Sequence, residues 1–552
     1  MSDFGTFIIG ETSPTKTYTI TNSGTLNLTG IAATKDGAHN GDFAITQPLA
    51  SSLAPGASTT FTVTYSPTAA DTRTAAVHIT SNDFDEALFD ISLTGFARAY
   101  PTNISLSTAT INENNAANAT VGTLTTTDTN VADTHTYTLV AGTGDEDNAS
   151  FTIAGNSLKL TPSADYETKI TYNLRLRTTD QTGLTYEKAF VVTIVKLNEA
   201  PVLSATQLNP TSAESPGVAT GTLGVNLFSA SVVTDIDFVS ASLGGGNIRV
   251  TFAEYITGDL IELPTGVTHA LNAVQLSGTN VQISDGSAWT TIATRDATNT
   301  GIGKALTLTL NAAATEDNIG YVINALMFRS TSDNPTVNQT KLTRSYSLVV
   351  NDGNNNALAG GPAALDSNTI AGGTLTITPD NDLPVVDLNG ATAGVNHAVT
   401  WTEVANGTHV TAAVTSSATM TDADNVNFSS MNFTLGAVLD GNSEVVTIGG
   451  TAFPLATDAT NTVVTGGFKV SYNSTTDVFT IEPNGAAYAT LTSFQTLLNG
   501  VTYNNLTNNP TDGDRTFTVM VTDAGLNNLA GVGSVSSTLV TTTINVNQSM
   551  IS

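Results

Sequence analysis

The feature that most constrains this chain is a repeated alternation of apolar and polar residues in short runs. Residues 16–21 read KTYTIT, residues 59–65 read TFTVTY and residues 89–94 read FDISLT, with turn residues such as the NSG of 22–24 between runs. Successive side chains of a strand point to opposite faces, so a period of two with a turn about every ten residues is typical of half-buried antiparallel sheets. The sequence therefore predicts an all-β chain of packed antiparallel sandwiches.

Length and composition limit what such a chain can be. Its 552 residues exceed one core, and about 100 to 200 residues per domain predicts roughly three to five domains. Lys and Arg total 18 against 47 Asp and Glu, a net charge of −29, which argues against nucleic acid or an anionic membrane as partner and favours cations. The chain has no cysteine, so a bound metal can take the stabilising role that disulfides play elsewhere.

Targeting signals are missing from the sequence. The first residues, MSDFGTFIIG, lack the basic start and long apolar run of a signal peptide, and no run approaches the about 18 apolar residues of a membrane span. Because residues 3–7 already have the pattern of the inside of a domain, we expect the chain to be a piece of a longer secreted or cell-surface protein. Membrane insertion is not expected.

Two proline-containing segments separate regions of strand-like sequence. Residues 378–384 read TPDNDLP, and residues 197–201 read LNEAP. Proline disfavours helix and biases its neighbour to extended backbone, so each segment predicts a stiff joint rich in side-chain oxygens. Both resemble the calcium-binding linker of cadherin-type repeats, DxNDNxP. The resemblance implies β-sandwiches joined end to end by Ca²⁺.

The joints and the turn pattern predict four domains, with borders at 1–98, 99–200, 201–383 and 384–552. The first resembles the immunoglobulin-like, choice-of-anchor type modules that precede bacterial surface anchors, on DFGTFIIGE, LAPGASTTFTVTYSP and ISLTGFA. That family normally has another strand before the DFG. Its absence would leave an open sheet edge near residues 1–7, to which another strand could add.

The second predicted domain resembles a bacterial cadherin-like repeat over its whole length. The matching residues are Glu113, Asp128, Asn130, Asp133, Asp165, Glu167, Asp180, Asn198 and Glu199. The resemblance implies that Glu113, Asp165 and Glu167 face the following linker, whereas Asp128, Asn130 and Asp180 face the preceding domain. Because the linker at residues 96–101 (FARAYP) carries no carboxylate, we expect a weak or absent metal site between the first two domains.

The rest of the chain contains an internal repeat. TDID at residues 234–237 recurs as TDAD at 421–424, and INALMF at 323–328 recurs as LNGVTY at 498–503. The two copies resemble long cadherin-like repeats of giant bacterial adhesins. Each also has apolar residues at helical spacing, which predicts one short helix at 316–325, after Thr315 as N-cap, and a second in the same register from Leu491.

Calcium takes about six to eight oxygen ligands, which carboxylate and amide side chains supply. For the joint between the second and third domains, the candidate ligands are Glu113, Asp165, Glu167, Asn198, Glu199, Asp235, Asp237 and Asp352. For the joint between the third and fourth, they are Glu214, Asp380, Asn381, Asp382, Asp422, Asp424 and Asp523, with Glu316 or Asp317 as a further ligand. The competing interpretation is that Asp and Asn gather in turns because they bend and cap backbone, with no ion bound.

No catalytic constellation stands out, so we predict that the chain is not an enzyme. Its six His are scattered, and there is no HExxH pair or GxSxG elbow. Trp289 and Trp401 could stack on sugar rings, although a Trp in an alternating strand is more often core. Three functions remain open: a calcium-rigidified structural segment of an extracellular bacterial adhesin or fibre; a self-polymerising filament or surface-layer subunit; and a carbohydrate-binding module. Expected partners are calcium, other copies or neighbouring repeats, and a surface glycan or protein receptor.

Overall fold

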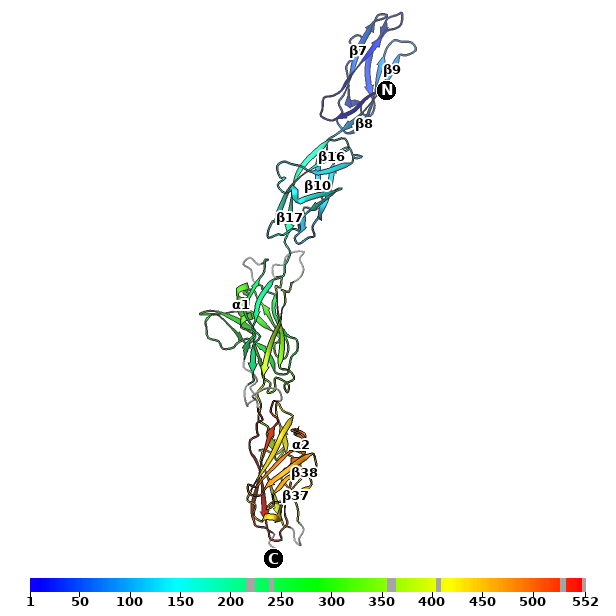
Figure 1. Ribbon diagram of the computed structural model, residues 1–552. Helices are drawn as coiled ribbons and strands as arrows, with labels where there is room; N and C mark the ends of the chain where they lie inside the picture. Colours follow the sequence, from blue (N-terminus) through cyan, green and yellow to red (C-terminus); the bar gives the residue numbers. More distant parts are fainter. Residues whose placement is uncertain (215–223, 238–242, 355–363, 404–408, 527–532, 549–552) are drawn as a thin grey trace. The chain divides into compact units, whose positions relative to one another are not determined.

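A computed structural model of the chain describes residues 1–214, 224–237, 243–354, 364–403, 409–526 and 533–548. These residues form mainly antiparallel sheets, with a few parallel strand pairs, and two short α-helices, which confirms the all-β prediction (Figure 1). The chain divides into two compact units, one ending at Leu197 and one beginning at Asn198. Four separate hydrophobic clusters lie along it. We refer to residues 1–98, 99–200, 201–383 and 384–552 as modules one to four, with these borders still a prediction.

Module one packs two sheets face to face. One has the order β1-β9-β8-β4 and the other β2-β7-β5, with a small β3-β6 pair beside them. The strands are β1 (Ser2–Ile8), β2 (Thr15–Thr21), β3 (Leu28–Thr29), β4 (Ala32–Asp36), β5 (Phe43–Ile45), β6 (Ser52–Leu53), β7 (Ser58–Tyr65), β8 (Asp71–Thr80) and β9 (Leu88–Arg98). The alternating runs of the sequence lie in β2, β7 and β9, with Phe61, Val63 and Tyr65 of β7 buried between the sheets.

Module two repeats the two-layer plan with the sheets β10-β12-β15-β14 and β11-β17-β16-β13. Its strands are β10 (Asn103–Leu106), β11 (Thr110–Asn112), β12 (Ala119–Thr127), β13 (His135–Leu139), β14 (Phe151–Ala154), β15 (Ser157–Leu160), β16 (Thr171–Asp180) and β17 (Thr185–Val195). In β16 every second residue is buried, so the period of two in the sequence marks the face that meets the core.

Modules three and four are each built on one large sheet that carries several smaller ones. In module three the strands are β18 (Val202–Gln207), β19 (Thr211–Ala213), β20 (Val225–Asn226), β21 (Phe228–Thr234), β22 (Asn247–Phe252), β23 (Asp259–Glu262), β24 (Leu271–Ser277), β25 (Asn280–Asp285), β26 (Trp289–Thr300), β27 (Leu306–Leu310), β28 (Met327–Ser330), β29 (Thr343–Asn351) and β30 (Ile370–Thr378). The main sheet has the order β19-β30-β29-β22-β27-β26-β25-β24.

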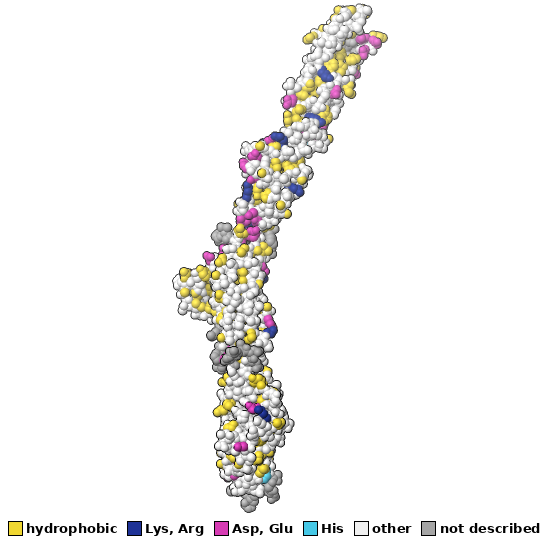
Figure 2. Space-filling model, in the orientation of Figure 1, with side chains coloured by type: hydrophobic (Ala, Val, Ile, Leu, Met, Phe, Trp, Pro, Cys, Tyr) yellow, Lys and Arg dark blue, Asp and Glu magenta, His cyan; other side chains and the backbone are white. Residues whose placement is uncertain are grey.

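In module four the main sheet runs β32-β44-β43-β35-β40-β39-β38. The strands are β31 (Val385–Asp387), β32 (His397–Thr402), β33 (Ala412–Ala413), β34 (Thr419–Thr421), β35 (Asn427–Gly436), β36 (Glu444–Ile448), β37 (Thr451–Pro454), β38 (Ala459–Val464), β39 (Phe468–Asn473), β40 (Val478–Pro483), β41 (Ala489–Thr490), β42 (Thr502–Asn505), β43 (Gly513–Asp523) and β44 (Val540–Asn547). On the face of the whole chain that Figure 2 shows, charged side chains are sparse, as expected when 12% of the residues are charged.

The two predicted helices are present. They are α1 (Glu316–Asn324) and α2 (Leu491–Asn499), one in each copy of the repeat. The Thr315 hydroxyl accepts a hydrogen bond from the Asn318 backbone N–H at 3.3 Å, so it caps the first helix as predicted. Apolar residues at helical spacing are buried in both helices, among them Ile319 and Ile323 in α1 and Phe494 and Leu498 in α2. This packing stabilises helices of nine residues, which would not be stable alone in water.

Each long module also contains one buried arginine that pairs with acid. In module three the Arg344 Nε donates to Asp259 at 2.7 Å, and in module four the Arg515 guanidinium contacts both Glu444 and Asp440, the latter at 2.9 Å. Both arginines also donate to backbone carbonyls of the loop before the strand that carries them, at Lys341 and Pro335 for Arg344 and at Thr511 for Arg515. Every charge of these pairs therefore has a partner inside the protein, and each arginine holds a loop to the core.

We predict that Arg515→Met lowers the free energy of unfolding of module four by about 3 to 5 kcal/mol, because the Glu444 carboxylate is left buried without its cation. Trp401 lies in the module-four core, so its fluorescence during urea unfolding, in a Trp289→Phe background, reports this module.

The matched control is Lys469→Met, which removes a cation that faces an exposed carboxylate and should change stability by less than about 1 kcal/mol. Equal effects of the two substitutions would contradict the importance of the buried pair.

Candidate metal sites

The segment 378–384 joins modules three and four, between β30 and β31, and its polar groups bind acids of both modules. The Asp380 backbone N–H donates to Glu214 Oε2 at 2.9 Å. The Asn381 side-chain amide donates to Asp523 Oδ2 at 2.8 Å, and the Asp382 N–H donates to Asp424 Oδ2 at 3.3 Å. The structure therefore brings together predicted residues that are up to 309 positions apart in the chain (523 − 214 = 309).

Two amides that the sequence analysis did not single out complete this joint. Asn425 donates to the Asn381 side-chain oxygen at 2.6 Å, and Asn334 donates to the Ala423 carbonyl at 2.7 Å. Asn425 follows the TDAD segment directly, so its position next to predicted ligands could have identified it from the sequence. No sequence feature relates Asn334 to Ala423, because their contact joins two different modules.

The acids of this joint are buried and act on one another as like charges. Glu214 is 7% exposed, Asp424 2% and Asp523 0%. Burial, reinforced by Asp382 and Asp424, raises the pKa of Glu214 to about 8. Burial, reinforced by the Asp422 carboxylate, raises the pKa of Asp424 to about 7. Such shifts mean that the ionised carboxylates are unfavourable here unless a cation compensates them.

Buried oxygens without donors indicate where such a cation fits. Glu214 Oε1 and Asp422 Oδ2 are buried and accept no hydrogen bond from the described residues. A cavity of about 430 Å³ lies at the joint, and its lining includes Asp333, Asp382 and Asp422. Several carboxylates, an amide oxygen and room between them match the hard oxygen ligands and flexible coordination of Ca²⁺. The residues of this joint therefore fit calcium.

A similar group of acids lies at the start of the second unit. Asn198 donates to Asp352 Oδ2 at 2.8 Å, and the Asp237 N–H donates to Asp235 Oδ1 at 3.0 Å. Burial, followed by the charges of Asp237, Asp352 and Glu316, raises the pKa of Asp235 to about 7. Asn198 Oδ1 and Asp235 Oδ2 are buried without a donor among the described residues. The segment at residues 234–237 thus resembles its copy at residues 421–424: both contain a buried acid with a raised pKa and a carboxylate oxygen without a donor in the part of the chain that is described.

Glu316 corrects one assignment made from the sequence. It was a possible ligand for the joint between modules three and four, but its carboxylate accepts the Asp235 N–H instead. The helix α1 places Glu316 in its first turn, next to β21, and so among the acids at the start of module three. Asp317 follows it in the same turn. The order of elements, which the sequence pattern did not reveal, decides this position.

In the first unit, Glu113, Asp165 and Glu167 place carboxylate oxygens within 4.8 Å of one another. Glu113 accepts the N–H groups of Tyr166 and Leu197, and burial raises its pKa. These are the three acids that the sequence analysis assigned to one end of module two.

One positive side chain lies against this group. The Lys196 ammonium contacts Glu167 at 2.8 Å. Glu199, the other predicted ligand nearby in the chain, belongs to the second unit, where its N–H donates to Asp237.

A second group in the first unit consists of Asp128, Asp133 and Asp180, again within 4.8 Å of one another. Asp133 was not assigned to this end from the sequence. Among the described residues, no other three His, Asp or Glu side chains place ligand atoms this close together, so the acids of segment 378–384 and its neighbours are more widely spread.

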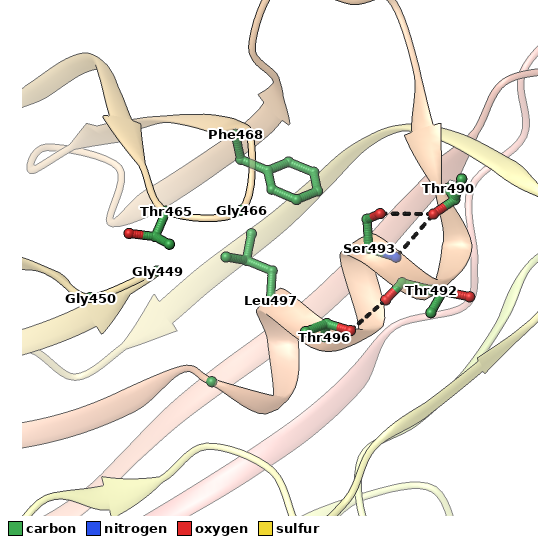
Figure 3. A pocket seen from close by; sticks show the side chains of 11 residues that line it. Gly449, Gly450, Thr465, Gly466, Phe468, Thr490, Thr492, Ser493, Thr496 and Leu497 are labelled. Carbon is green, nitrogen blue, oxygen red and sulfur yellow. Dashed lines mark hydrogen bonds between the residues drawn. The ribbon is translucent and has the colours of Figure 1, made fainter.

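A further cavity, beside α2, offers no comparable chemistry. It measures about 580 Å³ and is lined by glycines and hydroxyl side chains around Phe468 and Leu497, without a charged residue (Figure 3). The hydroxyls near it are engaged locally, since Thr490 bonds to Ser493 and Thr496 to the Thr492 carbonyl. It provides no acid, base or cation ligand.

The two tryptophans do not form an exposed platform for sugars. Trp401 is 2% exposed and belongs to the module-four core, and Trp289 is half-buried with its ring 4.8 Å from that of His269. Trp401 is therefore unavailable for stacking on a glycan. Within the residues that the structure describes, no helix is both long and apolar enough to cross a bilayer.

Comparisons with known proteins identify only distant similarities. No family model and no curated protein matches the chain. Solved structures similar to it include Protocadherin Gamma B2 extracellular cadherin domains 1–5 (14% identity, TM-score 0.30, covering 99% of this chain and 80% of that one) and the Protocadherin GammaB4 extracellular domain (12%, 0.32, 99% and 66%). Drosophila N-cadherin EC1–4 is similar at 11% identity and a TM-score of 0.23, covering 99% and 100%. Similarities this low carry no conclusion about function.

We predict that the metal-free protein loses stability as pH rises from about 5 to about 8. The raised pKa values of Glu214, Asp235 and Asp424 mean that the folded state holds more protons than the unfolded state, so stability is present at low pH and is lost as these groups ionise. Carboxyls with lowered pKa values act only below about pH 4.

Thermal unfolding in a chelator at pH 5, 6.5 and 8 checks this expectation, with calcium at pH 8 as the control that should restore stability. A metal-free protein that is more stable at pH 8 than at pH 5 would refute it.

Proposed function

We propose that the chain is a structural segment of an extracellular adhesin or fibre, in which calcium at the joints holds successive β-sandwiches in a defined orientation. The observation that carries this proposal is the joint at segment 378–384, which bonds to Glu214 on one side and to Asp424 and Asp523 on the other. A bacterial cell surface as its location rests on the sequence resemblance alone.

Calcium would be held at this joint by Glu214, Asp382, Asp422 and Asp424, with Asp523 held close by the Asn381 amide. When bound, the ion supplies the positive charge that these buried carboxylates otherwise lack. The Asp380 and Asp382 backbone N–H groups orient the Glu214 and Asp424 side chains by occupying one oxygen of each. The protein thus contributes to calcium binding a set of carboxylates whose orientation is fixed by hydrogen bonds from segment 378–384.

Each bound ion is expected to add only a modest free energy of stabilisation. Its main effect is expected on the orientation of neighbouring modules. Extracellular calcium sites bind at about 10⁻⁴ to 10⁻³ M. At a calcium concentration of about ten times Kd, an ion that binds only the assembled joint stabilises it by about 1.4 kcal/mol. Without the ion, repulsion between buried carboxylates opposes assembly, so the joint should open more readily than the modules unfold.

We expect Asp382→Asn combined with Asp424→Asn to remove most of the calcium-induced stabilisation of this joint, about 1.4 kcal/mol at ten times Kd. The change in small-angle scattering between calcium and chelator should then be smaller than in the parent chain, because this joint no longer responds to calcium. Asp380→Ala together with Asp382→Ala should behave alike.

Asp296→Asn is the matched control, since that carboxylate, in β26 and far from the joint in the sequence, accepts only the backbone N–H groups of Thr298 and Asn299. If scattering and melting of the parent chain do not respond to calcium at all, the proposed role is wrong.

We propose self-association by strand addition as a second candidate, because one sheet edge in module one is only half covered. β1 pairs with residues 93–98 of β9, whereas residues 88–92 pair with β8 alone in a module whose residues are all described. A cavity of about 280 Å³ opens there between the sheets, lined by Tyr18, Ile20 and Phe89 among others. An unpaired edge beside an apolar groove is the arrangement that accepts an added strand.

If this edge mediates self-association, Phe89→Asp should weaken it, because the substitution places a charge at the mouth of the groove. Sedimentation velocity over a range of concentrations measures the effect. Leu49→Asp is the control, at a residue of the same module that is exposed and does not line the groove. A parent chain that stays monomeric at every concentration tested would exclude this candidate.

A further inference from the structure

The contact between modules one and two is built around three acids that have almost no access to water. Asp128, Asp133 and Asp180 place oxygens within 4.8 Å of one another. The side chains of Asp128 and Asp133 are 3% and 4% exposed, and Asp180 is also buried. Three like charges this close and this shielded from water are unfavourable by themselves, and a positive charge beside them offsets that cost.

Arg98, the last residue of β9, brings that charge from module one. Its Nη1 donates to Asp133 Oδ2 at 2.9 Å, and its side chain is only 16% exposed. The guanidinium lies 4.9 Å from the ring of Phe96, which holds it from the other side. Arg98 belongs to the linker FARAYP, so the segment that lacks a carboxylate carries a cation instead.

The other two carboxylates are also partnered. Asp128 contacts the His135 ring at 3.0 Å. Asp180 Oδ1 accepts from the backbone N–H groups of Thr182 and Leu184 and from the Thr182 hydroxyl. Only Asp180 Oδ2 is buried without a donor.

An uncharged amide closes the same contact. Asn130, 1% exposed, accepts the Ala99 N–H at 2.8 Å and donates to Asp71 and to the Ala97 carbonyl, each at 3.1 Å. The oxygen and the nitrogen of the Asn130 amide therefore both form hydrogen bonds with module one or the linker. This joint differs from the one at segment 378–384, where the acids accept hydrogen bonds from backbone N–H groups and from the Asn381 amide, which Asn425 bonds in turn.

We propose that Arg98 is a built-in cation that takes the place of a divalent ion between modules one and two. This contact then forms without calcium, and loss of calcium loosens the joint between modules three and four while leaving this one closed. The proposal also predicts that removing the guanidinium exposes a latent calcium site, because Asp128, Asp133 and Asp180 remain together with one oxygen that already lacks a donor.

The absence of cysteine makes the test direct. Ala54→Cys and Ala117→Cys, both at exposed turn residues on opposite sides of the contact, accept spin labels whose distance distribution reports the orientation of the two modules in the full chain. With Arg98 present, the distribution should be equally narrow in calcium and in chelator. In Arg98→Ala it should broaden in chelator and narrow again when calcium is added.

Two further variants separate a cation role from a merely structural one. Arg98→Lys keeps the charge and should stay narrow in chelator. Arg98→Ala combined with Asp133→Asn removes both the cation and the carboxylate that it pairs with, and should gain no calcium response; the Asp133 Oδ1 atom also accepts from the Gln181 amide at 2.8 Å. Titration calorimetry should detect one additional site in Arg98→Ala, with a Kd of about 10⁻⁴ to 10⁻³ M, that is missing from the double variant.

A parent chain whose distribution broadens in chelator would overturn the proposal, and so would an Arg98→Ala chain that stays narrow without calcium. Either result concerns only modules one and two. The calcium proposal for the joint between modules three and four would then stand or fall on its own variants.

Discussion

The structure depends on how buried carboxylates at the ends of its modules are compensated. A sandwich that presents acids at its poles cannot place another sandwich against them unless each negative charge meets a cation or a donor. At segment 378–384, backbone N–H groups and the Asn381 amide each bond one oxygen of Glu214, Asp424 and Asp523, whereas Glu214 Oε1 and Asp422 Oδ2 are buried without a donor among the described residues. Burial, reinforced by the neighbouring carboxylates, raises the pKa of Glu214 to about 8 and that of Asp424 to about 7, and a divalent cation relieves this electrostatic condition.

The same requirement is met by arginine elsewhere in the chain. Arg98 pairs with Asp133 between modules one and two, and Arg344 and Arg515 pair with acids inside modules three and four. The chain has only 18 Lys and Arg against 47 Asp and Glu, so basic side chains are scarce. These three arginines nevertheless pair with buried acids. We propose that an arginine makes an external ion unnecessary at the acids that it pairs with, and that a metal compensates buried carboxylates that have no arginine beside them. This division underlies both the calcium proposal and the role proposed for Arg98.

Much of the local structure could be predicted because local structure follows from periodicity. The alternating runs lie in β2, β7 and β9, and the helices begin at Glu316 and Leu491 after capping threonines. Candidate ligands could be named for the same reason, since the TDxD and TPDNDLP segments are continuous in sequence. Their grouping could be predicted only in part. Glu316 was expected near Glu214 and lies beside Asp235, and Asn334, Asn425 and Asp133 were not assigned to the contacts that they make.

By itself, the sequence determined the class of fold, the places of the two helices, the repeat in the second half and the acidity that makes cations the expected partners. These properties depend only on residue order within short windows and on the overall composition, both of which are present in the sequence itself. Only the tertiary structure decided which acid meets a guanidinium, which meets an amide and which keeps a bare oxygen. Those contacts join residues tens to hundreds of positions apart, and their energies depend on burial, which exists only once the sheets have packed.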